Sequence, residues 1–112
     1  MANYKELMSE LKIFGIDSPI APVCDLFFEW ANDVIGDRSY GSKPEKVIAL
    51  AKSAIIGIEQ AGGIPFIKHI PGHGRTRVDS HYDLPVVDAP LTELEILILE
   101  YLKNLQARKY KL

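Results

Sequence analysis

The order of three segments between residues 16 and 68 limits the fold more than any other feature of this sequence. Residues 64–67 form a short apolar run directly after the Gly62-Gly63 turn signal, which favours a buried strand. A second strand is predicted over residues 16–23, although it contains two prolines, which are unusual in a central strand. The helix predicted between them, over residues 42–61, makes the unit a right-handed parallel βαβ repeat.

Two further helices are predicted outside this unit. Residues 3–14 carry an apolar stripe at helical spacing that Gly15 ends, and the stripe consists of Tyr4, Leu7, Met8, Leu11 and Phe14. A capping-box pattern, Thr92-Glu93-Leu94-Glu95, opens a third helix that continues through the apolar residues 96–99. The same pattern at residues 42–45, Ser-Lys-Pro-Glu, predicts the start of the middle helix.

The residues that could carry chemistry are concentrated in residues 68–81, directly after the strand predicted at residues 64–67. This stretch holds a lysine, three histidines, two arginines and an aspartate among glycines. Loops at strand ends present polar groups without burying unpaired backbone, and they carry function more often than regular elements do. We therefore expect the functional centre of the chain here.

The same loop resembles a known motif. Lys-His-Ile-Pro-Gly-His-Gly at 68–74, four further residues, Asp-Ser-His at 79–81 and Leu-Pro at 84–85 are similar to the signature of bacterial β-N-acetylhexosaminidases of glycoside hydrolase family 3. Ala-Pro-Val-Cys-Asp at 21–25 and the segment 34–41 match further parts of that family in the same order, so the resemblance covers about residues 4–95.

The resemblance implies a fold that is larger than this chain. The family folds as a (β/α)₈ barrel, and such barrels typically need ~250 residues. Residues 1–112 are therefore expected to form a single fragment of the N-terminal barrel domain. The expected fold class is α/β, a partial TIM (β/α)₈ barrel with about two parallel strands and three helices.

By resemblance, the catalytic pair is Asp79 and His81. In the family a histidine on this loop is the acid/base, and the aspartate two residues earlier orients it. An unperturbed imidazole has a pKa of ~6.5, so it can donate and recover a proton near neutrality. A carboxylate on one ring nitrogen fixes the tautomer and leaves the other nitrogen for the substrate.

Four more residues receive roles from the resemblance. Arg38, Lys68 and His69 are expected to bind sugar hydroxyls, and His73 is expected to hold the Pro-Gly-His-Gly turn. For Arg38 the alternative is a surface ion pair with a neighbouring aspartate. The aromatic side chains of residues 26–43 are expected to pack beneath their loop.

Other interpretations of the loop stay open. Asp79 and His81 could be an ordinary solvated pair. The three histidines with Asp79 could bind zinc, but no standard spacing of zinc ligands is present, and we predict no metal and no cofactor. The glycines at 72 and 74 could cradle a phosphate, yet the Gly-Lys-Ser/Thr ending of such loops is missing.

The family's nucleophile, an aspartate in an Asp-Asp-Leu-Ser-Met type segment, has no counterpart in these 112 residues, nor has the Asp-Gln-Glu-Gly-Gly segment that grips the sugar. The resemblance thus implies a fragment of a glycosidase that releases terminal N-acetylglucosamine from peptidoglycan-derived glycosides, expected to be inactive alone. The alternative is a catalytically inactive remnant, or a sugar-binding or interaction fragment.

Charge and cysteine content bound the partners. A net charge of −2 argues against nucleic acid and against a polybasic membrane signal, and no apolar run approaches the ~18 residues of a span. The single cysteine fits a reducing compartment, so we expect a cytoplasmic protein. The expected partners are a carbohydrate substrate and, because two parallel strands leave open edges, a complementary polypeptide or a second copy.

Overall fold

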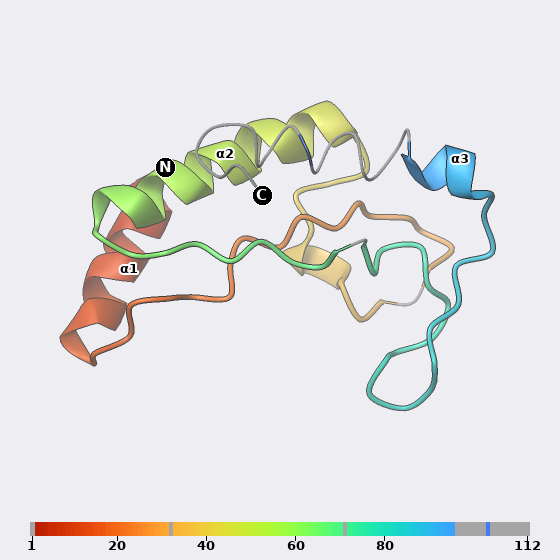
Figure 1. Cartoon of the computed structure of the whole chain (residues 1–112), viewed down its shortest axis with the longest axis horizontal. Coiled ribbons are helices and arrows are strands. Elements are labelled where there is room, and N and C mark those ends of the chain that lie inside the picture. Colours follow the sequence, from red (N-terminus) through yellow and green to blue (C-terminus); the bar gives the residue numbers. More distant parts are fainter. Residues whose placement is uncertain (1, 32, 71, 96–102, 104–112) are drawn as a thin grey trace.

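A computed structural model describes residues 2–31, 33–70, 72–95 and 103 of the chain. Helix α1 spans Ala2–Ile13, α2 spans Pro44–Gln60 and α3 spans Leu91–Leu94. A single turn of 3₁₀ helix, η1, spans Gly36–Arg38. Figure 1 shows α1 and α2 against each other on one side, while the extended segments and the long loop occupy the other.

The contact between α1 and α2 confirms the two predicted helices. Met8 of α1 is fully buried, as is Ile58 of α2. A side chain added at Gly63 would collide with both, so the chain after α2 passes directly over this contact. Phe14 is a correction to the predicted stripe, since it is 80% exposed. Helix α1 ends at Ile13, and the positive φ of 76° at Gly15 turns the chain out of helical phase.

Both predicted capping boxes are wrong. The residue that precedes α2 is Lys43, and the residue that precedes α3 is Pro90; neither makes a side-chain cap. Ser42 lies one residue too early to cap α2, where Pro44 sets the first turn with its fixed φ. The predicted continuation of the third helix through residues 96–99, and the basic end beyond it, lie outside the described residues.

Two extended segments, the first at residues 17–25 and the second at residues 64–68, run parallel to each other. Ile64 donates its N–H to the carbonyl of Asp17 and Phe66 donates to Pro19. Further along, Val23 and Lys68 form a parallel bridge. Its two hydrogen bonds run from the N–H of Lys68 to the carbonyl of Pro22, at 3.1 Å, and from the N–H of Cys24 to the carbonyl of Lys68, at 2.5 Å. Because these bonds bring the ends of both segments together, residues 24–25 lie beside residues 68–69.

The pairing is interrupted, and two regular strands are not found in the described residues. Between the second and third bonds the first segment advances three residues while the partner advances two. The extra residue lies in a tight turn, where Ala21 N–H bonds the carbonyl of Pro19 at 2.8 Å. Pro19 and Pro22 cannot donate to a ladder, which is why the pairing survives as single bonds rather than as a continuous strand.

The core lies where α2 covers the ends of the two segments. Its fully or nearly buried members are Cys24, Leu26, Val47 and Ala51, with Phe28, Tyr40, Ile48, Ile67 and Leu94 packed against them. Burial, with a smaller contribution from the Asp25 charge, raises the pKa of the Cys24 thiol to about 12. This thiol is therefore an apolar core group rather than a nucleophile.

Several large apolar side chains along the parallel segments remain exposed: Ile16, Ile20, Ile64 and Phe66. Of the predicted aromatic anchors, Phe28 and Tyr40 pack on the core, whereas Trp30 is 51% exposed. Within the described ranges, no helix is both long and apolar enough to cross a membrane.

Candidate active site

A buried carboxylate connects the ends of the two parallel segments. Asp25 ends the first segment, and its side chain is fully buried. Its Oδ2 lies 2.5 Å from Nδ1 of His69 and 3.2 Å from the backbone N of His69, which follows the end of the second segment. The imidazole is therefore attached to a residue that is 44 positions earlier in the chain.

The same carboxylate also holds the turn that follows. Oδ1 of Asp25 accepts the backbone N–H of His73 at 2.5 Å. One residue later, a Cβ at Gly74 would clash with the carbonyl oxygen of Leu26, so the loop lies directly on the first segment. Glycine is required here because the two backbones approach too closely for any side chain.

His73, for which a structural role is predicted, lies inside this turn. Its Nδ1 is 3.0 Å from the hydroxyl of Thr76, which is buried and also lies 3.1 Å from the carbonyl oxygens of His73 and Val78. Its Nε2 is buried and has no hydrogen-bond partner among the described residues. The ring packs at 5.6 Å, centroid to centroid, from that of His69.

Asp79 and His81 lie together on the outer part of the loop. Oδ1 of Asp79 is 2.6 Å from Nδ1 of His81 and accepts the backbone N–H of the same residue at 2.9 Å. This arrangement is an Asx turn, which residues two apart can form without help from the rest of the fold. The His81 side chain is 78% exposed, and in Figure 1 the loop extends away from the helices.

These bonds change the ionisation of the carboxyl group. The backbone N–H of His81, followed by its side chain, lowers the pKa of Asp79 from the ordinary 3.8. A smaller electrostatic contribution comes from His73. Asp79 is therefore ionised wherever the loop keeps this conformation at neutral pH, and it can act only as an acceptor towards His81.

The lowered pKa predicts how the loop responds to acid. Because the folded pKa lies below the unfolded one, ionised Asp79 stabilises the folded loop above pH 3.8, and this stabilisation is lost as the pH falls through the lower folded pKa. A carbon-13 NMR titration of the Asp79 carboxyl should show a midpoint below 3.8. His81→Ala should move the midpoint part of the way back, since the backbone bond remains. Tyr82→Ala should leave it unchanged. A wild-type midpoint at the ordinary value would contradict the prediction.

Arg38 and Lys68 are not drawn into either cluster. The guanidinium of Arg38 donates to the carbonyl oxygens of Val34 and Ile35, within its own turn, and not to a neighbouring aspartate as in the alternative interpretation. Lys68 contributes its backbone to the parallel pairing, and its side chain is half-buried. The structure thus joins His69 to Asp25 and His81 to Asp79 in two separate pairs.

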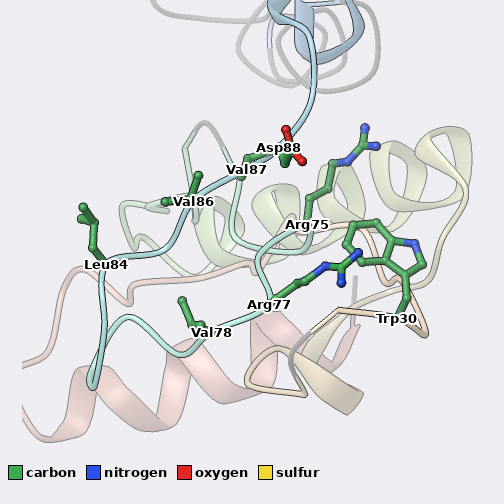
Figure 2. Close-up of a pocket in the computed structure, with 8 residues that line it drawn as sticks. All are labelled: Trp30, Arg75, Arg77, Val78, Leu84, Val86, Val87 and Asp88. Atoms are coloured by element: carbon green, nitrogen blue, oxygen red, sulfur yellow. The ribbon is translucent and has the colours of Figure 1, made fainter.

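An open pocket of about 770 Å³ lies between residues 75–78 of the loop and the returning segment 84–88 (Figure 2). Its walls are Trp30, Arg75, Arg77, Val78, Leu84, Val86, Val87 and Asp88. The guanidinium of Arg77 lies 5.7 Å from the ring centre of Trp30, and Arg75 is bound to Glu93 at 2.6 Å. None of the sugar-binding or catalytic residues expected from the sequence lines this pocket.

Sequence reasoning missed Asp25 as a site residue. It was noted only as part of a matching segment, although it is a polar residue at the end of a predicted parallel strand, as Lys68 is. That shared position was the available signal, because the carboxyl ends of parallel strands lie at one edge. The described residues contain no group of three or more His, Cys, Asp or Glu side chains that could hold a metal ion.

Comparison with known proteins identifies the family. The model of the glycosyl hydrolase family 3 N-terminal domain matches residues 5–108. A β-hexosaminidase of Tolumonas auensis is 46% identical over 89 residues, which are 80% of this chain and 26% of that protein. The chain thus spans about a quarter of the length of this relative.

Two solved structures extend the comparison. A glycoside hydrolase family 3 β-N-acetylglucosaminidase from Paenibacillus sp. FPU-7 is 39% identical with a TM-score of 0.88, over 95% of this chain and 20% of that one. NagZ from Neisseria gonorrhoeae, solved in complex with N-trifluoroacetyl-D-glucosamine, is 36% identical with a TM-score of 0.86, over 93% of this chain and 30% of that one. Because the family model matches residues 5–108, nearly the whole of this chain, the chain belongs to glycosyl hydrolase family 3, as part of the N-terminal domain.

Proposed function

We propose that this chain is a segment of a glycosidase that removes terminal N-acetylglucosamine from peptidoglycan-derived glycosides, with His81 as its acid/base. The observation that carries the proposal is the 2.6 Å contact between Nδ1 of His81 and Oδ1 of Asp79. Asp79 orients the ring through Nδ1, and Nε2 is then the nitrogen that can exchange a proton with the glycosidic oxygen. Positioned proton transfer of this kind typically contributes 10²–10⁴-fold to a rate.

Exposure of the pair is consistent with this role. An acid/base must reach its substrate, and the His81 side chain is 78% exposed on a loop. The Asp79 carboxylate contacts both the backbone N–H and Nδ1 of His81, which is the geometry that an orienting carboxylate requires. For the sugar itself, we propose that Arg38, Lys68 and His69 donate to or accept from its hydroxyls, with Arg38 first leaving the carbonyls of its own turn.

The reaction also needs a group that these 112 residues do not supply. A retaining mechanism uses a second residue as nucleophile, and the aspartate segment expected for that role is absent from this sequence. We propose that this stretch alone has little or no turnover. We also propose that the exposed Ile20, Ile64 and Phe66 are covered in the working protein by further barrel strands, from the same polypeptide or a complementary one. A cytoplasmic location stays a proposal, supported by the lone buried Cys24.

A chimera tests the catalytic role. We would place this chain in the Tolumonas auensis β-hexosaminidase, in exchange for its aligned segment, and assay a chromogenic N-acetylglucosaminide. The chimera should turn over the substrate, whereas the isolated chain should not. In the chimera, His81→Ala should lower kcat by about 10²–10⁴-fold. Ser80→Ala, at the exposed neighbouring position, should leave kcat within about twofold, as surface substitutions generally do.

The inactive remnant is the competing interpretation. It predicts a chimera that folds, by circular dichroism, but shows no turnover. A chimera that is active and insensitive to His81→Ala would instead overturn the assignment of the acid/base while keeping the glycosidase function. Turnover by the isolated chain would contradict our proposal that a nucleophile must come from elsewhere.

A further inference from the structure

The Asp25 carboxylate receives three contacts, and all of them come from groups that can donate. Two are backbone N–H groups, those of His69 and His73, and the third is Nδ1 of the His69 ring at 2.5 Å. The carboxylate is fully buried, whereas the His69 side chain is 37% exposed. The Nδ1 edge of the imidazole is therefore hydrogen-bonded to a buried group, while the rest of the ring reaches solvent.

The chemistry of the contact decides which ring nitrogen carries the proton. An ionised carboxylate only accepts, so Nδ1 of His69 must be the donor. In a neutral imidazole Nε2 then has a lone pair and no hydrogen. Among the described residues the hydrogen bond of the His69 ring is made through Nδ1, and the side chain is 37% exposed, so Nε2 remains available to a ligand.

We propose that Asp25 is a positioning residue that holds His69 in the Nδ1–H tautomer, so that Nε2 accepts a hydrogen bond from a sugar hydroxyl. The inference rests on the proposed function, because the ligand is the same sugar. It assigns different roles to the two neighbours: the Lys68 ammonium can only donate, whereas Nε2 of a neutral His69 can only accept. A sugar hydroxyl that donates its hydrogen to Nε2 of His69 can still accept a hydrogen bond from the Lys68 ammonium through its lone pairs. One donor and one acceptor side by side suit two adjacent (vicinal) sugar hydroxyls.

Asp25 connects this specificity to the loop that carries the acid/base. Its second oxygen bonds the N–H of His73, at the turn that leads into residues 75–81. The pair Asp79–His81 shows the same carboxylate-to-Nδ1 contact at 2.6 Å, but on an exposed part of the loop. Because Asp25 is buried, water competes less for its bond, and the tautomer should be held more firmly than that of His81.

Wild-type protein is the first test. Long-range proton–nitrogen NMR of the nitrogen-15 labelled chain distinguishes protonated from unprotonated ring nitrogens. It would be run at about pH 8.5, well above the ordinary imidazole pKa of ~6.5. His73→Gln and His81→Gln assign the three rings by elimination. We expect His69 to show a protonated Nδ1 and an unprotonated Nε2. An Nε2–H tautomer, or a doubly protonated ring at this pH, would overturn the proposal.

Asp25→Leu is the matched variant. Leucine is close to aspartate in size and offers no acceptor to the His69 ring, whereas an asparagine oxygen could still occupy the Oδ2 position and preserve the tautomer. The Nδ1–H form of His69 should therefore cease to dominate. In the chimera described above, the same substitution should weaken binding of N-acetylglucosamine by about 3–10-fold, as for one lost hydrogen bond. Asp79→Leu serves as the control, since it should leave the His69 tautomer unchanged. If Asp25→Leu keeps the wild-type tautomer, the positioning role is wrong.

The two proposals fail separately in this design. If the wild-type chain shows the expected His69 tautomer but the chimera does not bind N-acetylglucosamine, the result would count against the proposed function and leave the positioning role supported. If the chimera binds the sugar but the His69 proton lies on Nε2, the result would count against the positioning role and leave the function supported.

Discussion

Asp25→Ala should lower the free energy of unfolding by about 2–5 kcal/mol, because buried donors left without an acceptor each cost about 1–3 kcal/mol. The substitution removes the acceptor for the N–H groups of His69 and His73 and for the His69 ring. It also empties space at the point where the two parallel segments and the loop meet. Urea denaturation followed by circular dichroism gives the change from the shift in midpoint.

Asp83→Ala is the control for this prediction. Asp83 lies in the same loop and is exposed, and among the described residues its carboxylate accepts only the neighbouring backbone N–H of Leu84. Its replacement should change the free energy of unfolding by no more than about 0.5 kcal/mol. Equal effects of the two substitutions would mean that the Asp25 contacts do not stabilise the fold.

Met8→Ala should also be strongly destabilising, by about 2–5 kcal/mol, which is the usual cost of truncating a fully buried methionine or leucine. Met8 of α1 is 0% exposed, and its side chain lies beside Ile58 of α2 at the point where Gly63 passes over both. Removing its thioether leaves a cavity at the main contact between the two long helices. The same denaturation experiment measures the loss.

Leu7 provides the comparison within the same helix. It is adjacent to Met8 but 45% exposed, so Leu7→Ala should cost clearly less, about 1 kcal/mol or below. If both truncations cost the same, α1 does not pack on α2 through Met8. The helix would then be held to the rest of the chain chiefly by its end, where Lys12 bonds the carbonyl of Gly62 at 3.1 Å.

The helices were predictable because their signals are local. The helices predicted over residues 3–14 and 42–61 match α1 and α2 to within one or two residues at each end. The capping boxes failed for a local reason as well. Pro44 can begin a helix without a side-chain cap, and the sequence pattern alone could not rank proline against serine.

The site divides in the same way. Asp79 and His81 are two residues apart and form an Asx turn, so their contact was accessible from sequence. Asp25 and His69 are 44 residues apart, and nothing in their local sequence requires them to meet. Their contact depends on the parallel register, which the prolines at 19 and 22 shift by one residue in a way that periodicity does not report.

By itself the sequence determined the helices, the polar loop and membership of the family, because periodicity and motif spacing are properties of residues close together in the chain. Only the tertiary structure decided that Asp25 accepts hydrogen bonds from His69 and His73 and that the backbone of Gly74 packs directly against that of Leu26. It also decided that the predicted strands pair through isolated hydrogen bonds. These contacts join residues tens of positions apart, and such closures are selected by packing and hydrogen-bond satisfaction in the folded chain.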